Sequence, residues 1–172
     1  MKPYLIKKGN HYCLHPIKLH YDRKRLITEF MFPDSCAYDL HSKDQFDWNK
    51  VVGLGFGFNH HHNSYRIGAR FDPLSRKMEL GHYYYNHKLR HDTSMVFVKL
   101  NQHIKSDISF SRSDNTIWNR IYVGTDGRWT EVYNNTLFFD FRKVPRWGFF
   151  LYPFQGGNEP AQHDTTYLLD IL

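Results

Sequence analysis

Apolar and polar residues alternate through most of this chain, in short runs that turn residues separate. Side chains two positions apart lie on the same face of a strand, so this period indicates strands that are half buried in a core. We expect strands at residues 25–32, 64–71, 76–86, 94–100, 104–110, 116–123, 136–141, 146–154 and 165–172. The Asp126-Gly127 pair between two of these runs is typical of a tight hairpin turn.

Short strands at a spacing of roughly ten residues are typical of antiparallel sandwiches and barrels. We therefore predict an all-β fold, an antiparallel two-sheet β-sandwich of the jelly-roll kind found in concanavalin-like lectins. Only residues 43–50 suggest a helix, as a short turn that Ser42 would cap. The chain has 172 residues, of which 41% are hydrophobic, and no internal repeat or linker interrupts it. Residues 1–172 should thus form a single β-sandwich domain around one core.

Charge and hydropathy limit the partners and the location. The formal charge is +6, and the densest basic patch is Arg23-Lys24-Arg25. Nucleic-acid binding usually needs a stronger cluster, and no run of 18 apolar residues could cross a membrane, so neither partner is expected. The N-terminal residues 1–16 lack the apolar segment of a secretory signal, which favours a cytoplasmic or virion location. Cys13 and Cys36 lack metal-binding spacing, so we expect free thiols and no cofactor.

The run from residue 64 to residue 86 is expected to form a hairpin with two unlike faces. Its core face would carry the alternate residues Tyr65, Ile67, Ala69, Phe71, Met78, Leu80, His82 and Tyr84. Pairing residue 71 with residue 76 across the turn would set these pairs opposite each other: Arg66 with Gly81, Gly68 with Glu79, and Ser64 with Tyr83. The polar face would then gather Arg66, Arg70, Glu79, Tyr83 and Tyr85.

This polar face is the first candidate binding site. Arginine binds carboxylate, phosphate or sulfate through two-point contacts, and tyrosine offers a flat apolar face with a polar tip. Such a set suits a sugar, including an acidic one. The alternative is cross-strand stabilisation, in which Arg66 or Arg70 pairs with Glu79 and the tyrosines cover the aliphatic stems.

A second candidate surface lies on the run at residues 116–123. Alternation points Ile117, Ile121 and Val123 into the core, and the outward residues are Trp118, Arg120 and Tyr122. An outward row of this composition can stack on sugars or anchor an interface. We include these three among the candidate ligand-binding residues.

The three consecutive histidines at residues 60–62 do not form a recognisable metal motif. In an extended chain His60 and His62 would point to the same side, but a zinc site needs three or four ligands. His82, His87 and His91 are candidates for a third ligand, yet nothing in the spacing brings them close. We predict no metal site and assign the cluster to a polar loop.

Three stretches carry a resemblance: DQFDWNK (44–50), HHHNSYRIGARFD (60–72) and LYPFQGGNEPAQHD (151–164). They resemble small uncharacterised β-sandwich proteins of gut Bacteroidetes and their bacteriophages. The sequence departs from that pattern at Gln155 and Gln162. The terminal segment also looks like the last strand of lectin-like and polysaccharide-lyase jelly rolls, a likeness of fold that does not determine function.

We therefore expect a non-enzymatic β-sandwich module, with no catalytic residue, that binds glycan or assembles at a virion surface. Its partners would be glycans, other virion or surface proteins, or further copies in a homo-oligomer. The alternative is a polysaccharide lyase acting on acidic glycans. Arg66 or Arg70 would neutralise the carboxylate, and the proton transfers would fall to a histidine such as His60 or His82 and to Tyr83 or Tyr85. A purely structural subunit is the third expectation.

Overall fold

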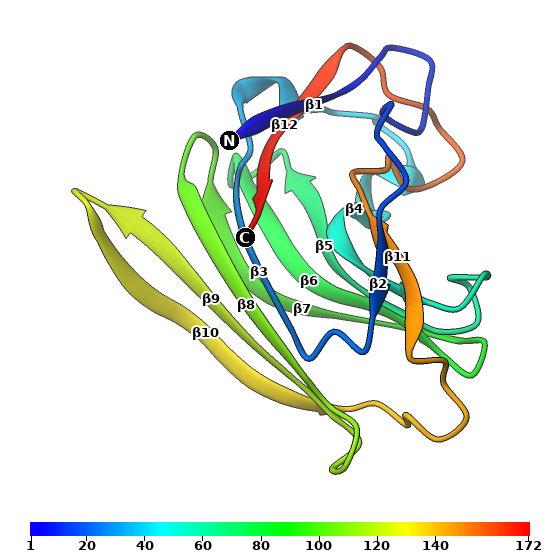
Figure 1. The fold of residues 1–172 in the computed structure, drawn as a ribbon. Coiled ribbons are helices and arrows are strands. Elements are labelled where there is room, and N and C mark those ends of the chain that lie inside the picture. The colour runs from blue at the N-terminus through cyan, green and yellow to red at the C-terminus, as the bar shows by residue number, and fades with distance from the viewer.

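The computed structural model describes residues 1–172 as two antiparallel sheets of six strands each (Figure 1). In the first sheet the strands are ordered β1 (Lys2–Ile6), β12 (Thr165–Ile171), β3 (Arg25–Met31), β8 (His103–Ser111), β9 (Thr116–Thr125) and β10 (Arg128–Phe138). In the second they are ordered β2 (Leu19–Tyr21), β11 (Trp147–Leu151), β4 (Asn49–Phe56), β5 (Ser64–Asp72), β6 (Lys77–Asn86) and β7 (Leu89–Lys99). The predicted all-β, two-sheet antiparallel class is confirmed.

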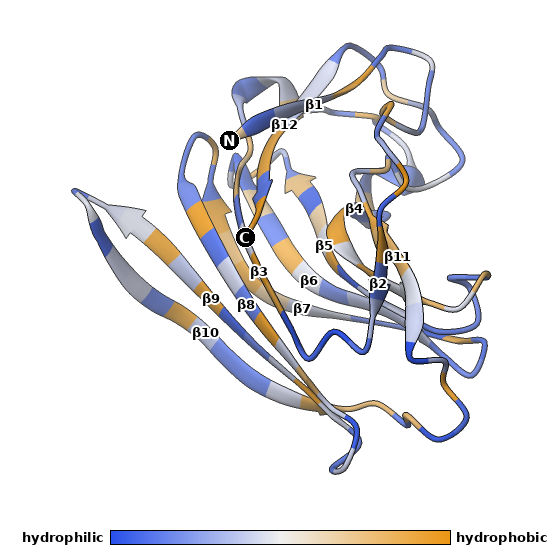
Figure 2. Ribbon diagram, in the orientation of Figure 1, coloured by the Kyte–Doolittle hydropathy of each residue, from blue (hydrophilic) through white to orange (hydrophobic).

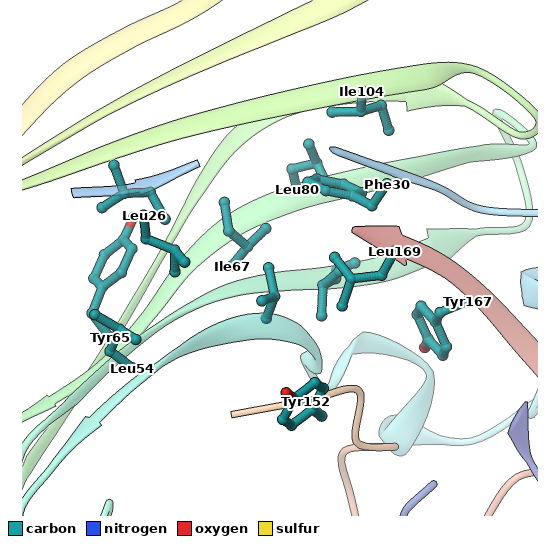
Figure 3. Packing of buried hydrophobic residues seen from close by; sticks show 14 of the residues in the cluster. Leu26, Phe30, Leu54, Tyr65, Ile67, Leu80, Ile104, Tyr152, Tyr167 and Leu169 are labelled. Carbon is teal, nitrogen blue, oxygen red and sulfur yellow. The ribbon is translucent and has the colours of Figure 1, made fainter. Parts of the chain in front are cut away.

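The core lies between the two sheets. Apolar and polar residues alternate along strands such as β3 and β8, as the colours of Figure 2 show. Figure 3 shows the apolar side chains packing together, with Leu26, Phe30 and Ile104 from the first sheet and Leu54, Ile67 and Leu80 from the second. These six side chains are fully or almost fully buried. Burial of apolar area at about 25 cal/mol per Å² is the main force that holds such sheets together.

Several strands differ from the expected ranges. Strands β1, β2 and β4 were not expected, and β4 is buried on both faces, so it shows no alternation. Strand β10 begins eight residues before the expected run at 136–141. It is an edge strand with mostly exposed side chains on both faces, which again removes the period of two. The observed strand β11 (Trp147–Leu151) is shorter than the expected run at 146–154.

The predicted faces of the β5–β6 hairpin are correct, but the predicted pairs are wrong. Arg66 lies opposite Tyr83, Gly68 opposite Gly81, and Arg70 opposite Glu79. The reason is that the four-residue turn lies one position later than expected, at residues 73–76, where the Asp72 carboxylate accepts two backbone N–H groups. The register differs from the expected one by two residues, an even shift, so every side chain stays on its predicted face.

Two local predictions are confirmed. Asp126 and Gly127 have φ values of 52° and 75° and join β9 to β10, as expected for a tight hairpin turn. The expected helical turn is the 3₁₀ helix η2 (Lys43–Phe46), and the Ser42 hydroxyl accepts the backbone N–H of Asp44 at 3.3 Å. A second 3₁₀ helix, η1, spans Asp34–Cys36. Neither helix has the length and apolar character that crossing a membrane requires.

Candidate functional site on the outward face of the second sheet

Two adjoining cavities lie on the face of the second sheet that points away from the core. The first, here called the cationic pocket, has a volume of about 210 Å³ and is lined by Lys50, His60, His61, Ser64, Arg66, Tyr83, Tyr85 and Phe154. The second, here called the tryptophan pocket, has a volume of about 380 Å³ and is lined by Phe46, Asp47, Trp48, Lys50, Arg70, Tyr83, Arg90, Asp92, Gly157 and Asn158. Lys50 and Tyr83 line both cavities, so the two form one groove.

Trp48 is seated on a gap in the sheet that two glycines create. Gly68 and Gly81 lie opposite each other on β5 and β6, and the indole packs directly over them. A Cβ atom at Gly81 would come within 2.7 Å of the indole Cζ3, so no larger residue fits there without moving the ring. Trp48 Nε1 donates to the Asp92 carboxylate at 3.2 Å, and the Arg70 guanidinium lies 4.3 Å from the ring centroid. The indole is thus fixed by the two glycines, by the hydrogen bond to Asp92 and by the Arg70 guanidinium over its ring.

Arg70 has its charge fully partnered. Its Nε donates to the Glu79 carboxylate at 2.6 Å, and its Nη1 donates to the Phe46 carbonyl at 2.8 Å. This cross-strand ion pair is the stabilising alternative that the sequence left open. Arg70 and Glu79 therefore serve first to fix the wall of the tryptophan pocket.

Arg66 is in a different situation. Only 8% of its surface is exposed, and its Nη2 donates to the Tyr152 carbonyl at 3.2 Å. No carboxylate pairs with it, its Nε has no hydrogen-bond partner, and the nearby Ser64 hydroxyl has none either. Gly53 makes room for this side chain, because a Cβ atom there would lie 2.9 Å from Arg66 Cγ. Burial lowers the pKa of Arg66 to about 10.

The other basic groups of the cationic pocket respond to the same environment. Burial, and then the Arg66 charge, lower the pKa of Lys50 to about 8, and its ammonium lies 4.5 Å from the Tyr83 ring centroid. Burial, then Arg66 and His61, lower the pKa of His60 to about 4. The imidazole of His60 is therefore neutral at neutral pH.

The candidate residues predicted from the sequence fall on two opposite surfaces. Arg66, Tyr83 and Tyr85 line the cationic pocket, and Arg70 lines the tryptophan pocket with Glu79 beside it. Trp118, Arg120 and Tyr122 lie on β9, on the outward side of the first sheet, and do not join them. There the Arg120 guanidinium stacks 4.4 Å from the Trp118 ring and donates to Asp107 at 2.6 Å.

Sequence reasoning missed several residues of the groove: Trp48, Lys50, Arg90, Asp92 and Phe154. Lys50 belongs to β4 and Arg90 and Asp92 to the first half of β7, neither of which was expected as a strand. Phe154 reaches the groove through an isolated bridge to Lys50. One signal was available, because two glycines inside strand patterns indicate that something bulky packs over them.

The histidines at residues 60–62 lie in a turn, so the extended arrangement considered above does not occur. The ring centroids of His60 and His61 lie 4.3 Å apart, with the ring planes tilted by 36°, and both residues line the cationic pocket. The suggested third ligands lie elsewhere: His82 is buried in the core, and His91 stacks on Tyr84. No group of three or more His, Cys, Asp or Glu residues is placed to hold a metal ion.

A basic cavity of about 300 Å³ lies apart from this groove, between the loops around Asp22 and Arg112. Its charges are already neutralised in part, because the Asp22 carboxylate lies 3.4 Å from Arg112 Nε and 2.8 Å from Arg146 Nη1. Arg112 also donates to the carbonyls of Val144 and Pro145. Through these contacts Arg112 links the loops that carry Asp22, Val144 and Pro145.

No protein-family model matches the sequence, and no curated protein matches it either. Solved structures do share its fold. A xylan β-1,4-xylosidase from Bacillus halodurans C-125 superposes with a TM-score of 0.52 at 11% identity, over 96% of this chain and 32% of the xylosidase. A GH131 β-glucanase catalytic domain from Podospora anserina superposes with a TM-score of 0.50 at 7% identity, over 98% of this chain and 70% of that one.

A Ruminococcus gnavus IT-sialidase CBM40 bound to α2,3-sialyllactose matches more loosely, with a TM-score of 0.43 at 8% identity, over 88% of this chain and 78% of that one. The chain spans only about a third of the xylosidase. The predicted jelly-roll β-sandwich is confirmed by the two six-stranded antiparallel sheets and by the likenesses to the xylosidase and the β-glucanase. They concern the fold, because identities this low carry no information about which ligand a groove binds.

Proposed function

We propose that this protein is a glycan-binding β-sandwich module whose site is the groove formed by the cationic and tryptophan pockets. The observation that carries the proposal is the side chain of Tyr83, which lines both cavities with the Lys50 ammonium 4.5 Å from its ring. Sugars bind where aromatic faces cover their C–H groups and convergent donors meet their hydroxyls. Part of the xylosidase and the β-glucanase catalytic domain named above share this fold, so the fold is compatible with a glycan ligand.

The module is proposed to act without turnover. A lyase would use the same pocket, where Arg66, His60, Tyr83 and Tyr85 come together and from which His82 is excluded. A general base works best with a pKa near the operating pH. The pKa of His60 is lowered to about 4, and burial and then Tyr85 raise the pKa of Tyr83 well above its usual range. His60 is thus a weak base and Tyr83 is a weak acid, and both properties favour binding over catalysis.

A surface location is part of the proposal. The resemblance of residues 44–50, 60–72 and 151–164 to small β-sandwich proteins of gut Bacteroidetes and their bacteriophages supports a module that faces outward from a particle, such as a virion. A homo-oligomer at such a surface would present several copies of the groove, and avidity would then raise the apparent affinity for a repeating polysaccharide.

Affinity electrophoresis against a panel of neutral and acidic polysaccharides tests the proposal. We expect retention by at least one polysaccharide, and we expect Tyr83→Ala to reduce that retention about tenfold or more, because a stacked ring is lost from both cavities. Trp118→Ala is the matched control, since it removes an aromatic ring from the opposite face and should leave retention unchanged.

Three outcomes contradict the proposal in different ways. Loss of retention in Trp118→Ala but not in Tyr83→Ala would move the site to the first sheet. New ultraviolet absorbance from unsaturated sugar during the same incubations would establish a lyase. Retention by no polysaccharide would leave a structural subunit as the function.

A further inference from the structure

We infer that the cationic pocket binds a carboxylate-bearing sugar unit of the glycan and that Arg66 supplies the counter-charge. The inference rests on the proposed function and adds the chemical class of the ligand. It concerns one end of the groove, where the lining residues include Arg66, Lys50, His60 and His61 but no aspartate or glutamate.

The charge of Arg66 is unbalanced. Charged groups in protein interiors are normally paired, because removing a charge from water costs several kcal/mol. Arg66 is the one arginine among the buried residues, yet it donates to a carbonyl and not to a carboxylate. A ligand anion would complete this arrangement.

Arg66 differs from most other arginines of the protein. Seven better-exposed arginines have a carboxylate within 3.5 Å, in the pairs Arg25–Asp107, Arg70–Glu79, Arg90–Asp92, Arg112–Asp22, Arg120–Asp107, Arg142–Asp140 and Arg146–Asp22. The fold thus partners arginines that water could also have solvated. Arg66 is more buried than these arginines and lines a cavity, yet no carboxylate pairs with it.

The walls around this charge combine a polar group with aromatic rings. The Ser64 hydroxyl is buried without a partner two residues from Arg66, on the same outward face of β5. Tyr83, Tyr85 and Phe154 add ring surface. A cavity of about 210 Å³ is smaller than the sites that hold drug-sized ligands, so it suits one sugar ring, with the rest of the chain continuing past Lys50 and Tyr83.

The test compares each acidic polysaccharide of the panel, polygalacturonate and alginate among them, with its own carboxyl-reduced form. Reduction converts the carboxylate to a hydroxymethyl group and keeps the backbone. We expect affinity, measured by isothermal titration calorimetry, to fall about tenfold or more on reduction, because a charge-assisted contact is lost. Arg66→Gln should lower affinity for the acidic form to a similar extent and should scarcely change affinity for the reduced form.

Arg128→Gln is the control, because it removes the same charge from the exposed β9–β10 turn of the other sheet. It should bind as the unaltered protein does. A thermal melt of Arg66→Gln verifies folding, and the comparison of acidic with reduced ligand tests the inference without any variant.

The outcomes separate the inference from the proposed function. Equal affinity for acidic and reduced forms would overturn the inference and leave glycan binding in place. Preference for a sulfated polysaccharide, such as a carrageenan, over every carboxylated one would also overturn it. If Arg128→Gln lowered affinity for the acidic polysaccharide as much as Arg66→Gln does, the effect would come from the overall charge of the protein and the inference would fail. Binding to no polysaccharide at all would contradict the proposed function itself.

Discussion

The ring of His82 joins the two sheets through the interior of the protein: its Nδ1 lies 2.6 Å from the Tyr65 hydroxyl on the same sheet, and its Nε2 lies 2.8 Å from the Tyr133 hydroxyl on the other. Asn119 and Asn135 each donate a further hydrogen bond to one of these hydroxyls. A neutral imidazole satisfies this network with one donor and one acceptor nitrogen. A protonated ring would donate to both hydroxyls and leave their own protons without a recorded acceptor.

Acid should therefore destabilise the fold through His82. Burial lowers its pKa to about 4, below the value of about 6.5 in an unfolded chain. The stabilisation is complete above pH 6.5 and is lost as the pH falls toward 4, by up to about 3 kcal/mol. Urea denaturation at several pH values measures this loss. His82→Phe should flatten the dependence over this range, and an unchanged slope in that variant would assign the acid sensitivity to other groups such as His60.

Substitution of Gly81 should disturb Trp48. In Gly81→Ala the new Cβ atom would meet the indole, and overpacking of this kind costs about 1–3 kcal/mol in the free energy of unfolding. Gly68→Ala is the matched variant, because its Cβ atom would lie 3.1 Å from the ring and should cost less. Chemical denaturation followed by tryptophan fluorescence ranks the two. Equal stability of both variants would show that the indole is not held against the glycines.

Lys50 should titrate at lower pH than an ordinary lysine. Its pKa is lowered to about 8, chiefly by burial and next by Arg66. Arg66→Gln should raise this pKa part of the way toward its usual value, because the burial remains. NMR titration of reductively methylated protein reports the pKa directly. Arg128→Gln should leave it unchanged, and a similar rise there would mean that Lys50 senses overall charge.

Asp107 should be worth more to stability than a surface acid. Its carboxylate accepts from Arg25 Nε at 2.7 Å and from Arg120 Nη2 at 2.6 Å, and these contacts lower its pKa. Asp107→Asn should cost about 1–3 kcal/mol, since hydrogen bonds to a charged group are lost. The contribution is present above the unfolded pKa near 4 and fades below it. Asp126→Asn, in an exposed turn, should change the free energy of unfolding little.

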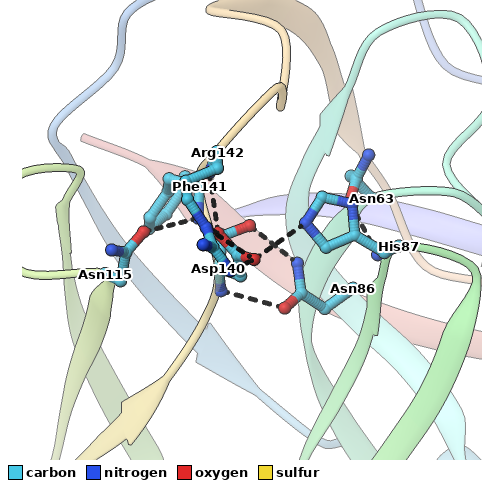
Figure 4. Close-up of polar contacts among 7 residues, drawn as sticks. All are labelled: Asn63, Asn86, His87, Asn115, Asp140, Phe141 and Arg142. Atoms are coloured by element: carbon cyan, nitrogen blue, oxygen red, sulfur yellow. Dashed lines mark hydrogen bonds and ion pairs between the residues drawn. The ribbon is translucent and has the colours of Figure 1, made fainter.

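The segment after β10 is held by two asparagines (Figure 4). Asn86 exchanges two hydrogen bonds with the backbone of Asp140, at 3.0 and 2.9 Å, and the side-chain Oδ1 of Asn115 accepts the Phe141 N–H at 2.8 Å. Asn86→Ala should destabilise the protein by about 1–2 kcal/mol and speed amide exchange at Asp140. Hydrogen-exchange mass spectrometry checks this. Asn10→Ala, at an exposed loop, should leave the exchange of this segment as it was.

The fold class and some of the residues that line the groove could be predicted from the sequence. Buried residues recur at alternate positions of strand β9, and this alternation placed Trp118 correctly on the outward face. Strand β5 is buried on both faces, but polar and apolar residues still alternate along it, which placed Arg66 correctly. Seven of the eight residues of strand β4 are buried, so the strand shows no alternation that could have placed Lys50 on a face. The pairing of Gly68 with Gly81 depended on the position of one four-residue turn, which residues 72–76 did not reveal.

The two outer faces could not be told apart from the sequence either. Alternation reports whether a side chain points inward or outward, but not which sheet carries it. Trp118 and Tyr83 are both outward residues, and only the strand order separates them onto opposite sides of the sandwich. Likewise, the absence of a carboxylate beside Arg66 is a property of tertiary packing, because acids are present nearby in sequence.

The strict division of the β5–β6 hairpin into inward and outward positions has a consequence for engineering. Inward residues such as Tyr65, Ile67 and Leu80 hold the sandwich together, and their outward neighbours Ser64, Tyr83 and Tyr85 line a cavity. A combinatorial library restricted to the outward set can therefore vary what the groove recognises while the scaffold keeps its folding determinants.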